Sequence, residues 1–177
     1  MKKFPLFALL VFAGAGWLYF TPYMAVDKLQ AAAEAGDTQA LNEMVDFPEL
    51  RTSLKSEVQG AVARGIQRDG GIFAALGSAV TGVVVDPVVN AAVTPEGISL
   101  LMKGRRPTDD EGESSGDDES WRENVKIARR YEAADKFVVQ YRDRESGDER
   151  ISLVMRREGL RWRLSGVRFP GSAPDEK

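Results

Sequence analysis

Histidine and cysteine carry most nucleophilic, metal-binding and haem-binding chemistry in proteins, and both are absent from this chain of 177 residues. Their absence excludes Ser-His-Asp and Cys-His nucleophile systems, imidazole and thiolate metal sites, and haem attachment through cysteine. The sequence also lacks a G-x-G-x-x-G, a P-loop and an EF-hand pattern. We therefore expect no cofactor, no metal site and no catalytic residue, although carboxylate chemistry or a serine activated by lysine would still be open to the chain.

The acidic residues fit structural roles better than catalytic ones. Residues 109–111 and 117–119 are acidic clusters without the glycine and the ligand spacing of a calcium loop, so we expect a solvated segment there. Asp46 precedes a Phe-Pro turn, and Arg51 follows it. Because the helix dipole favours a carboxylate at a helix start, we expect an ion pair between Asp46 and Arg51 that fixes this turn.

A set of basic residues alternates with the apolar positions of four predicted strands, with no acid counted among them. Residues 121–170 carry thirteen basic and eight acidic side chains, whereas residues 107–120 carry seven acidic side chains and no basic one. We expect one basic sheet face. It is either a solvated surface that serves solubility or a contact for an anionic partner such as lipid headgroups, for which the acidic segment would compete. The candidate contact residues are Lys126, Arg130, Arg142, Arg150, Arg156, Arg161 and Arg163.

Strands after residue 121 must position this basic set. The apolar period there is two, with runs at residues 125–127, 137–141, 151–155 and 160–164, and turn residues separate the runs. This spacing predicts an antiparallel meander of four strands. Only one face of the sheet is predicted to be apolar, so the helices before residue 105 have to cover it.

Helical periodicity is confined to the first part of the chain. Thr21-Pro22 resembles an N-cap followed by proline at the first helical position, and it predicts a new helix at that point. Capping residues and apolar spacing predict helices over residues 22–35, 38–45, 48–66 and 95–103.

Residues 72–93 form a second apolar stretch, with Asp86 as the only charge and Pro87 as an interruption. The uninterrupted part is too short to cross a bilayer, so we expect it to pack against the sheet. An apolar cleft at that contact, able to accept a lipid or another hydrophobic ligand, is the alternative to simple core packing.

The first twenty residues predict a membrane location. Lys2 and Lys3 precede an apolar run over residues 4–20, which as a helix would span ~25 Å, and aromatic residues gather near its end. We expect a single-pass anchor in the cell inner membrane, with the lysines in the cytoplasm and the C-terminal domain extracytoplasmic, in the periplasm. The alternative is a signal peptide cleaved after Ala15, followed by secretion. Nucleic acid is not an expected partner of an exported chain with a net charge of -3.

These elements predict an α+β protein in which an N-terminal transmembrane helix precedes several amphipathic helices that cover a four-stranded antiparallel meander. The order of elements resembles NTF2-like or cystatin-like folds, a fold analogy that implies no function. The predicted parts are a membrane anchor or signal segment (1–22), a helical part (23–104), an acidic disordered linker (105–121), a sheet that packs with the helical part (122–170) and a tail (171–177).

Several short segments resemble one bacterial family. They are residues 31–37, 45–51 (VDFPELR), 94–97 (TPEG) and 159–164 (GLRWRL). The family is an uncharacterised one, domain of unknown function number 2939, and the resemblance covers nearly the whole chain except the acidic stretch, which looks like an insertion. The resemblance implies a membrane-anchored or exported protein of helices followed by strands, and it implies no activity and no catalytic residues.

The expected function is non-catalytic. We expect a membrane-tethered extracytoplasmic domain that binds or scaffolds an envelope protein or lipid, with membrane contact through residues 4–20. One alternative is a binder of a lipid or another hydrophobic ligand. The other is a carboxylate-dependent hydrolase that acts on envelope material, which would need two or more buried carboxylates about 5 to 10 Å apart in one cleft.

Overall fold

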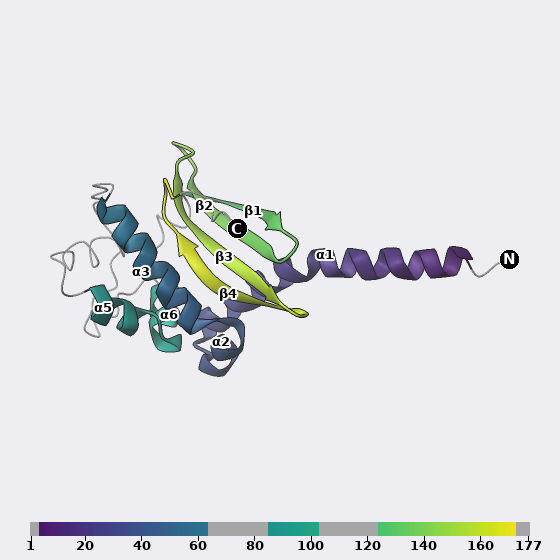
Figure 1. Ribbon diagram of the computed structural model, residues 1–177, viewed down its shortest axis with the longest axis horizontal. Helices are drawn as coiled ribbons and strands as arrows, with labels where there is room; N and C mark the ends of the chain where they lie inside the picture. Colours follow the sequence, from purple (N-terminus) through teal and green to yellow (C-terminus); the bar gives the residue numbers. More distant parts are fainter. Residues whose placement is uncertain (1–3, 64–84, 103–123, 173–177) are drawn as a thin grey trace.

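The computed structural model describes residues 4–63, 85–102 and 124–172. Figure 1 shows helices packed beside one curved sheet, with the N-terminal half of α1 projecting away from the domain. The predicted α+β architecture is confirmed, whereas the linker predicted at 105–121 lies outside the described residues. The elements are α1 (Phe4–Ala35), α2 (Thr38–Met44), α3 (Phe47–Ala63), α5 (Val85–Ala92), α6 (Pro95–Met102), β1 (Val125–Ala133), β2 (Lys136–Asp143), β3 (Glu149–Glu158) and β4 (Arg161–Arg168).

The sheet is the predicted antiparallel meander, in the order β1-β2-β3-β4. Tyr141 on β2 lies opposite Ile127 on β1 and Ile151 on β3, and Val139 lies opposite Leu153. Because side chains alternate across a strand, these rows share one face. That face is turned towards the helices and forms the sheet side of the core.

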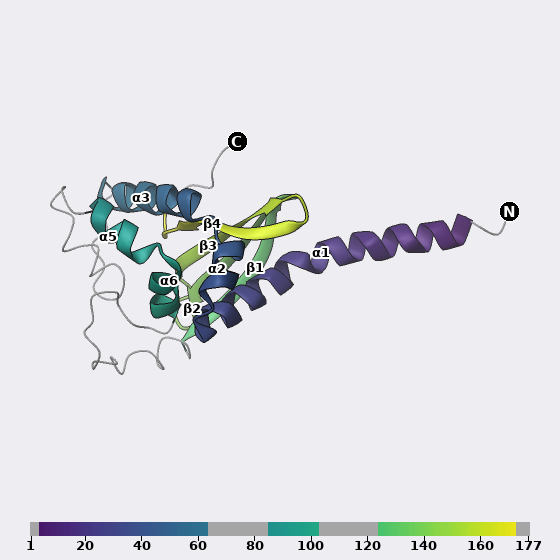
Figure 2. The ribbon, with the colours of Figure 1, turned by 90° about the horizontal axis from the view of Figure 1, so that it is seen from below.

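Helix α3 runs along the outer edge of β4, where unpaired backbone groups need partners. The Ser53 hydroxyl accepts a hydrogen bond from the Val167 N–H and donates one to the Val167 carbonyl, both at 3.1 Å. At the start of α3, the Asp46 N–H donates to the Leu164 carbonyl at 2.8 Å. The helix therefore closes this sheet edge, an arrangement visible from below in Figure 2.

Helix α1 continues through Pro22, so the prediction of a new helix at Thr21-Pro22 is wrong. A proline inside a helix leaves the carbonyl four residues earlier without its usual N–H donor. Here that carbonyl, of Leu18, accepts a hydrogen bond from the Thr21 hydroxyl at 2.7 Å. The helix ends as predicted at Gly36, whose φ of 70° is one that glycine adopts without strain.

The helix starts predicted at residues 38 and 95 are confirmed, and each has a capping side chain. The Asp37 carboxylate accepts from the Ala40 N–H at 3.0 Å, and the Thr94 hydroxyl accepts from the Gly97 N–H at 2.9 Å. A Cβ at Gly97 would lie 2.4 Å from the Ala92 carbonyl oxygen, so only glycine allows α5 and α6 to approach this closely. These caps fix the two short helices against the end of the sheet core.

Two expectations about the sheet are wrong. Its second face also buries apolar side chains, because Val138 and Val154 are only 0% and 4% exposed. The alternating pattern predicts Leu160 in the last strand, but this residue lies in the turn before β4 and is 79% exposed. The sheet is therefore buried on both faces in part, and its β3–β4 turn presents an apolar side chain outwards.

Within the described ranges, no helix combines the length and the apolar character needed to cross a bilayer. The anchor predicted for residues 4–20 stays a prediction.

Candidate functional site

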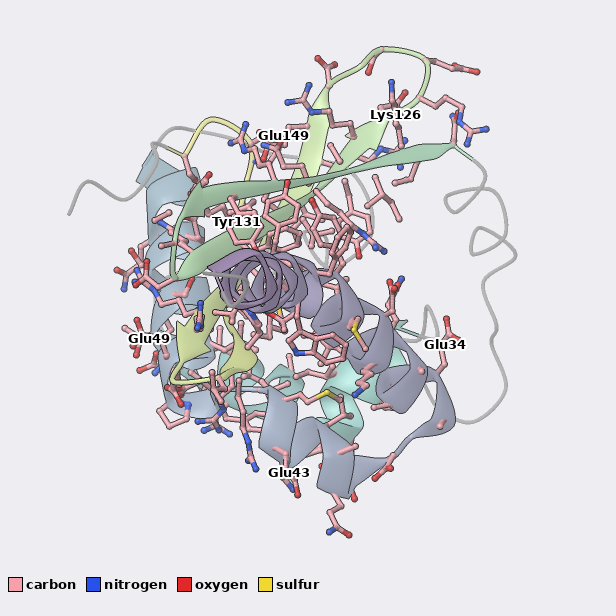
Figure 3. The ribbon with its side chains drawn as sticks, turned by 90° about the vertical axis from the view of Figure 1, so that its right-hand side faces the viewer. Glu34, Glu43, Glu49, Lys126, Tyr131 and Glu149 are labelled. Carbon is pink, nitrogen blue, oxygen red and sulfur yellow. The ribbon has the colours of Figure 1, made fainter. Side chains whose placement is uncertain are left out.

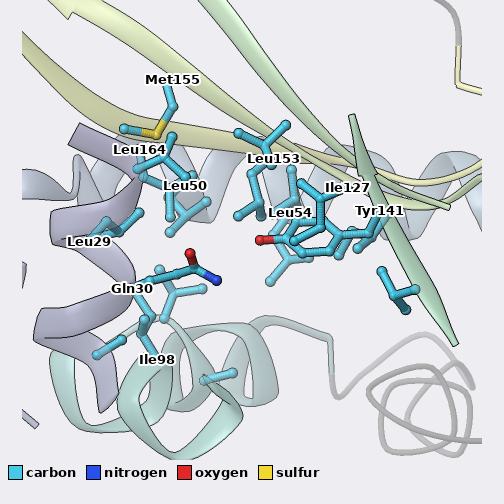
Figure 4. A pocket seen from close by; sticks show the side chains of 18 of the residues that line it. Leu29, Gln30, Leu50, Leu54, Ile98, Ile127, Tyr141, Leu153, Met155 and Leu164 are labelled. Atoms are coloured by element: carbon cyan, nitrogen blue, oxygen red, sulfur yellow. The ribbon is translucent and has the colours of Figure 1, made fainter. Parts of the chain in front are cut away.

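An apolar pocket lies between the inner face of the sheet and helices α1, α3, α5 and α6. Its volume is about 370 Å³, and Figure 4 shows side chains from both layers facing this space. Nearly all of its lining is aliphatic or aromatic. The lining residues are Val26, Leu29, Gln30, Ala33, Glu34, Leu50, Leu54, Ala92, Val93, Ile98, Val125, Ile127, Val139, Tyr141, Ile151, Leu153, Met155, Leu164, Val167 and Phe169.

The local folding of each element explains why these residues meet. Leu50 and Leu54 are four residues apart on α3 and share one helix face, as the helical spacing predicted. On the sheet, alternate residues of β2 and β3 such as Val139, Tyr141 and Leu153 turn to the same side. Two amphipathic layers therefore face each other without filling all of the space between them.

Two polar groups point into this apolar space from opposite layers. Figure 4 shows the Tyr141 hydroxyl of β2 and the Gln30 amide of α1 directed towards each other across the pocket. Neither side chain makes a hydrogen bond to another part of the chain that the structure describes. Burial raises the pKa of the Tyr141 hydroxyl, and the nearby positive charge of Arg129 opposes the rise. The phenol is therefore neutral at pH 7 and can donate or accept a hydrogen bond.

The charge of the pocket lining is negative. Glu34 on α1 is the only charged residue of this lining in the described part of the chain, and no lysine or arginine lines it. Arg129, the cation nearest to Tyr141, lies outside the lining and is paired with Asp27 at 2.9 Å. Ile127, which also lines the pocket, is 44% exposed and marks an opening to solvent. The pocket can thus accept a hydrophobic group from outside and offers hydrogen bonds, but no positive charge, to a polar group.

The cleft predicted at residues 72–93 overlaps this pocket in part. Ala92 and Val93 belong to the lining, while residues 72–84 lie outside the described ranges. Gln30 was not singled out from the sequence. The sequence pattern could have identified it as a site residue, because Gln30 interrupts an apolar helix face formed by Val26, Leu29 and Ala33.

The seven predicted basic residues do not form one open cationic face. Arg130 pairs with Glu132 at 3.1 Å, Arg163 pairs with Glu158 at 3.2 Å, and Arg150 pairs with Asp143. Lys126 and Arg142 lie opposite each other on β1 and β2, and Arg156 lies opposite Arg163 on β3 and β4. Arg161 is exposed at the start of β4. Their role in an anionic contact stays a prediction.

Glu132 contradicts the expectation that no acid shares the basic face. Its carboxylate accepts two hydrogen bonds from Arg168 at 2.8 and 2.7 Å and lies 3.5 Å from the Lys136 ammonium. These hydrogen bonds lower the pKa of Glu132 to about 2, although burial opposes the effect. Because Glu132 lies on β1 and Arg168 on β4, the ion pair crosses the second face and covers β2 and β3 between them.

Asp46 has a structural role, but its predicted partner is wrong. Its carboxylate accepts from the Glu49 N–H at 3.2 Å and lies 3.9 Å from the Arg163 guanidinium. Arg51 instead donates to the Val93 carbonyl at 2.8 Å. Residues five apart do not share a helix face, so Arg51 turns away from Asp46 and towards α5.

The fold and the pocket define a small α+β domain with an apolar pocket between its helices and its sheet. The sequence profile described as Protein of unknown function (DUF2939) matches residues 11–101, just over half of the chain, and the chain belongs to this family. The match covers the helices that form one wall of the pocket. It ends before the sheet, so the segment at 159–164 that was counted in the resemblance lies outside it. Neither a curated protein nor a solved structure matches the chain significantly.

Proposed function

We propose that the protein is a non-catalytic, membrane-tethered binding module that holds one hydrophobic molecule between its sheet and its helices. The pocket carries this proposal. Its volume of about 370 Å³ lies within the range of ~300–1,000 Å³ that is usual for ligand sites. An apolar cavity of ~150 Å³ is enough to bind benzene. The space therefore suits a larger ligand, such as one alkyl chain or a fused ring system.

The polar groups of the pocket favour a ligand whose polar end is uncharged. Tyr141 and Gln30 can hydrogen-bond an alcohol, ester or amide group. An anionic headgroup would meet Glu34 and no cation from the lining, because the nearby Arg129 is already paired with Asp27 at 2.9 Å, and burial of an unpaired charge is costly. A neutral amphiphile such as a monoacylglycerol fits this arrangement better than a fatty-acid anion.

The tether is the second part of the proposal. Lys2 and Lys3, the apolar run over 4–20 and the exposed aromatic side chains of Trp17 and Phe20 support a single-pass anchor in the inner membrane with a periplasmic domain. The helices that cover one curved sheet also favour an NTF2-like or cystatin-like arrangement.

A hydrolase acting on envelope material is the competing function. It needs two neighbouring buried carboxylates, whereas Glu34 is the one carboxylate of the pocket lining among the described residues. The pocket therefore favours binding over hydrolysis.

Photolabelling of the full chain in nanodiscs tests the pocket. A monoacylglycerol that carries a diazirine in its acyl chain is expected to label peptides of α3 and β2–β3 that line the pocket. Leu153→Trp should largely abolish this labelling, because a larger side chain at that position occupies the space. Labelling by a diazirine-bearing fatty acid at pH 8 is expected to be weaker than labelling by the neutral probe.

Leu160→Trp is the matched control, since it makes the same change at an exposed turn outside the pocket. It should leave the labelling of the pocket peptides unchanged. Equal labelling of the wild-type chain and Leu153→Trp would contradict the proposal, as would labelling confined to residues 4–20.

A further inference from the structure

Two hairpin turns of the sheet lie beside α1 at the point where this helix leaves the domain. The Tyr131 hydroxyl, near the β1–β2 turn, donates to the Tyr19 carbonyl at 2.8 Å, and the two rings stack with centroids 5.2 Å apart. The Trp162 indole, near the β3–β4 turn, donates to the Thr21 hydroxyl at 2.9 Å. Figures 1 and 3 show both turns next to α1, with Tyr131 directly beside it. These contacts fix the turns at the level of residues 19–21.

The two ends of the sheet differ in charge. Residues 129–136 carry three basic and two acidic side chains, and residues 156–163 carry four basic and one acidic side chain, which gives +1 and +3. The β2–β3 turn at the other end, residues 143–150, carries two basic and four acidic side chains, which gives -2. The two turns beside α1 therefore carry +4 together, a charge that Asp27 and Asp46 partly offset through Arg129 and Arg163, whereas the β2–β3 turn carries -2.

Exposed apolar side chains accompany this basic charge. Leu160 is 79% exposed at the β3–β4 turn, and on α1 Trp17, Tyr19 and Phe20 are 66%, 54% and 61% exposed. An open groove between α1 and the β1–β2 turn is lined by tyrosine, leucine, alanine and arginine side chains, including Arg157. Interfacial aromatic residues, an aliphatic tip and arginines are the composition that favours the headgroup region of a membrane.

We propose that the sheet end formed by residues 129–136 and 156–163 docks on an anionic bilayer surface, with Leu160 inserted among the headgroups. Arg157 and Arg161 then contact anionic lipid phosphates, and neither has a carboxylate partner in the described part of the chain. Because α1 is fixed to both turns, insertion of its N-terminal half would bring this sheet end, and not the acidic one, to the membrane. The inference rests on the tether proposed above and is independent of the pocket.

The absence of native cysteine allows a direct test with single labels on the full chain. A fluorophore on Leu160→Cys, in nanodiscs with 30% phosphatidylglycerol, is expected to be quenched by headgroup-labelled nitroxide lipid. The same label on Ser146→Cys, in the opposite turn, is the matched control and should stay unquenched. Equal quenching at the two positions would overturn the docking. Failure of the chain to enter nanodiscs would overturn the tether and the docking together.

Charge variants separate electrostatic docking from simple proximity. Each arginine near an anionic surface favours the bound state about fivefold, so Arg157→Gln with Arg161→Gln should lower the docked-to-free ratio about 30-fold. The same double change at Arg142 and Arg144, towards the far end, should leave the quenching at residue 160 unaltered. The anionic contact would be refuted if the label at residue 160 were quenched equally in nanodiscs of pure phosphatidylcholine. It would also be refuted if the double change of Arg157 and Arg161 left the quenching unaltered.

Discussion

Glu132 offers a quantitative test of the ion pair that crosses the second face of the sheet. Its side chain is 16% exposed, and the Arg168 side chain is 8% exposed. The hydrogen bonds from Arg168 hold the pKa of Glu132 at about 2 instead of its usual 4.5. A pKa difference of one corresponds to ~1.36 kcal/mol. The pKa of Glu132 is lower by about 2.5 in the folded chain, so its ion pair contributes about 3 kcal/mol to the free energy of unfolding.

The direction of the pH dependence follows from the lowered pKa. The contribution of Glu132 is complete above 4.5, where the carboxylate is ionised in both the folded and the unfolded chain. It is lost as the pH falls from 4.5 through about 2, because the unfolded chain binds the proton first. We therefore expect Glu132→Gln to lower the free energy of unfolding by about 3 kcal/mol at pH 7, and this gap to narrow steadily below pH 4.5.

Urea unfolding of the full chain in detergent micelles measures the gap, with the buried Trp162 as a fluorescent reporter. Glu145→Gln is the matched control, since Glu145 is an exposed carboxylate in the β2–β3 turn, and it should change stability by less than about 0.5 kcal/mol. A gap below about 1 kcal/mol at pH 7, typical of an exposed pair, would refute the reasoning. So would a gap of the same size at pH 3 and pH 7.

Three further substitutions test the packing that holds the pocket walls. Gly97→Ala would place a Cβ 2.4 Å from the Ala92 carbonyl oxygen, so we expect a loss of about 1–3 kcal/mol in thermal or urea unfolding. Ser53→Ala leaves the edge N–H of Val167 without its partner and should cost about 1–3 kcal/mol, with faster hydrogen exchange at that amide. Thr21→Val removes the acceptor of a buried indole N–H, and we expect a loss of about 1–3 kcal/mol and an altered tryptophan emission maximum.

The sequence predicted those parts of the fold that depend on local periodicity. Alternation around Val139 and Tyr141, and the cap at Asp37, are local signals, and the structure places them as expected. The signal at Thr21-Pro22 is ambiguous, because the same dipeptide can begin a helix or lie inside one. The outcome depends on a donor for the Leu18 carbonyl, and the Thr21 hydroxyl supplies it.

The site was harder to predict, because it depends on contacts between distant residues. Strict alternation already places Glu132 on the same side as Arg130, but its main partner Arg168 lies 36 residues later and three strands away. The pocket is the space left between two layers, and no residue pattern states how closely helices and sheet approach. Two signals were readable: the apolar stretch at residues 72–93, of which Ala92 and Val93 line the pocket, and Gln30, a polar group on an apolar helix face.

Helix α1 links the pocket to the proposed membrane contact and sets the distance between them. Residues 19–21 hold the two hairpin turns, while residues 26–34 of the same helix line the pocket. At ~1.5 Å per residue, these two stretches are separated by roughly 10–20 Å along the helix axis. If the turns lie on the headgroups, the pocket lies roughly 10–20 Å from the bilayer surface and outside the bilayer. A ligand drawn from the membrane would then have to leave the bilayer to be bound, and burial of its headgroup in the pocket costs less when that headgroup is neutral.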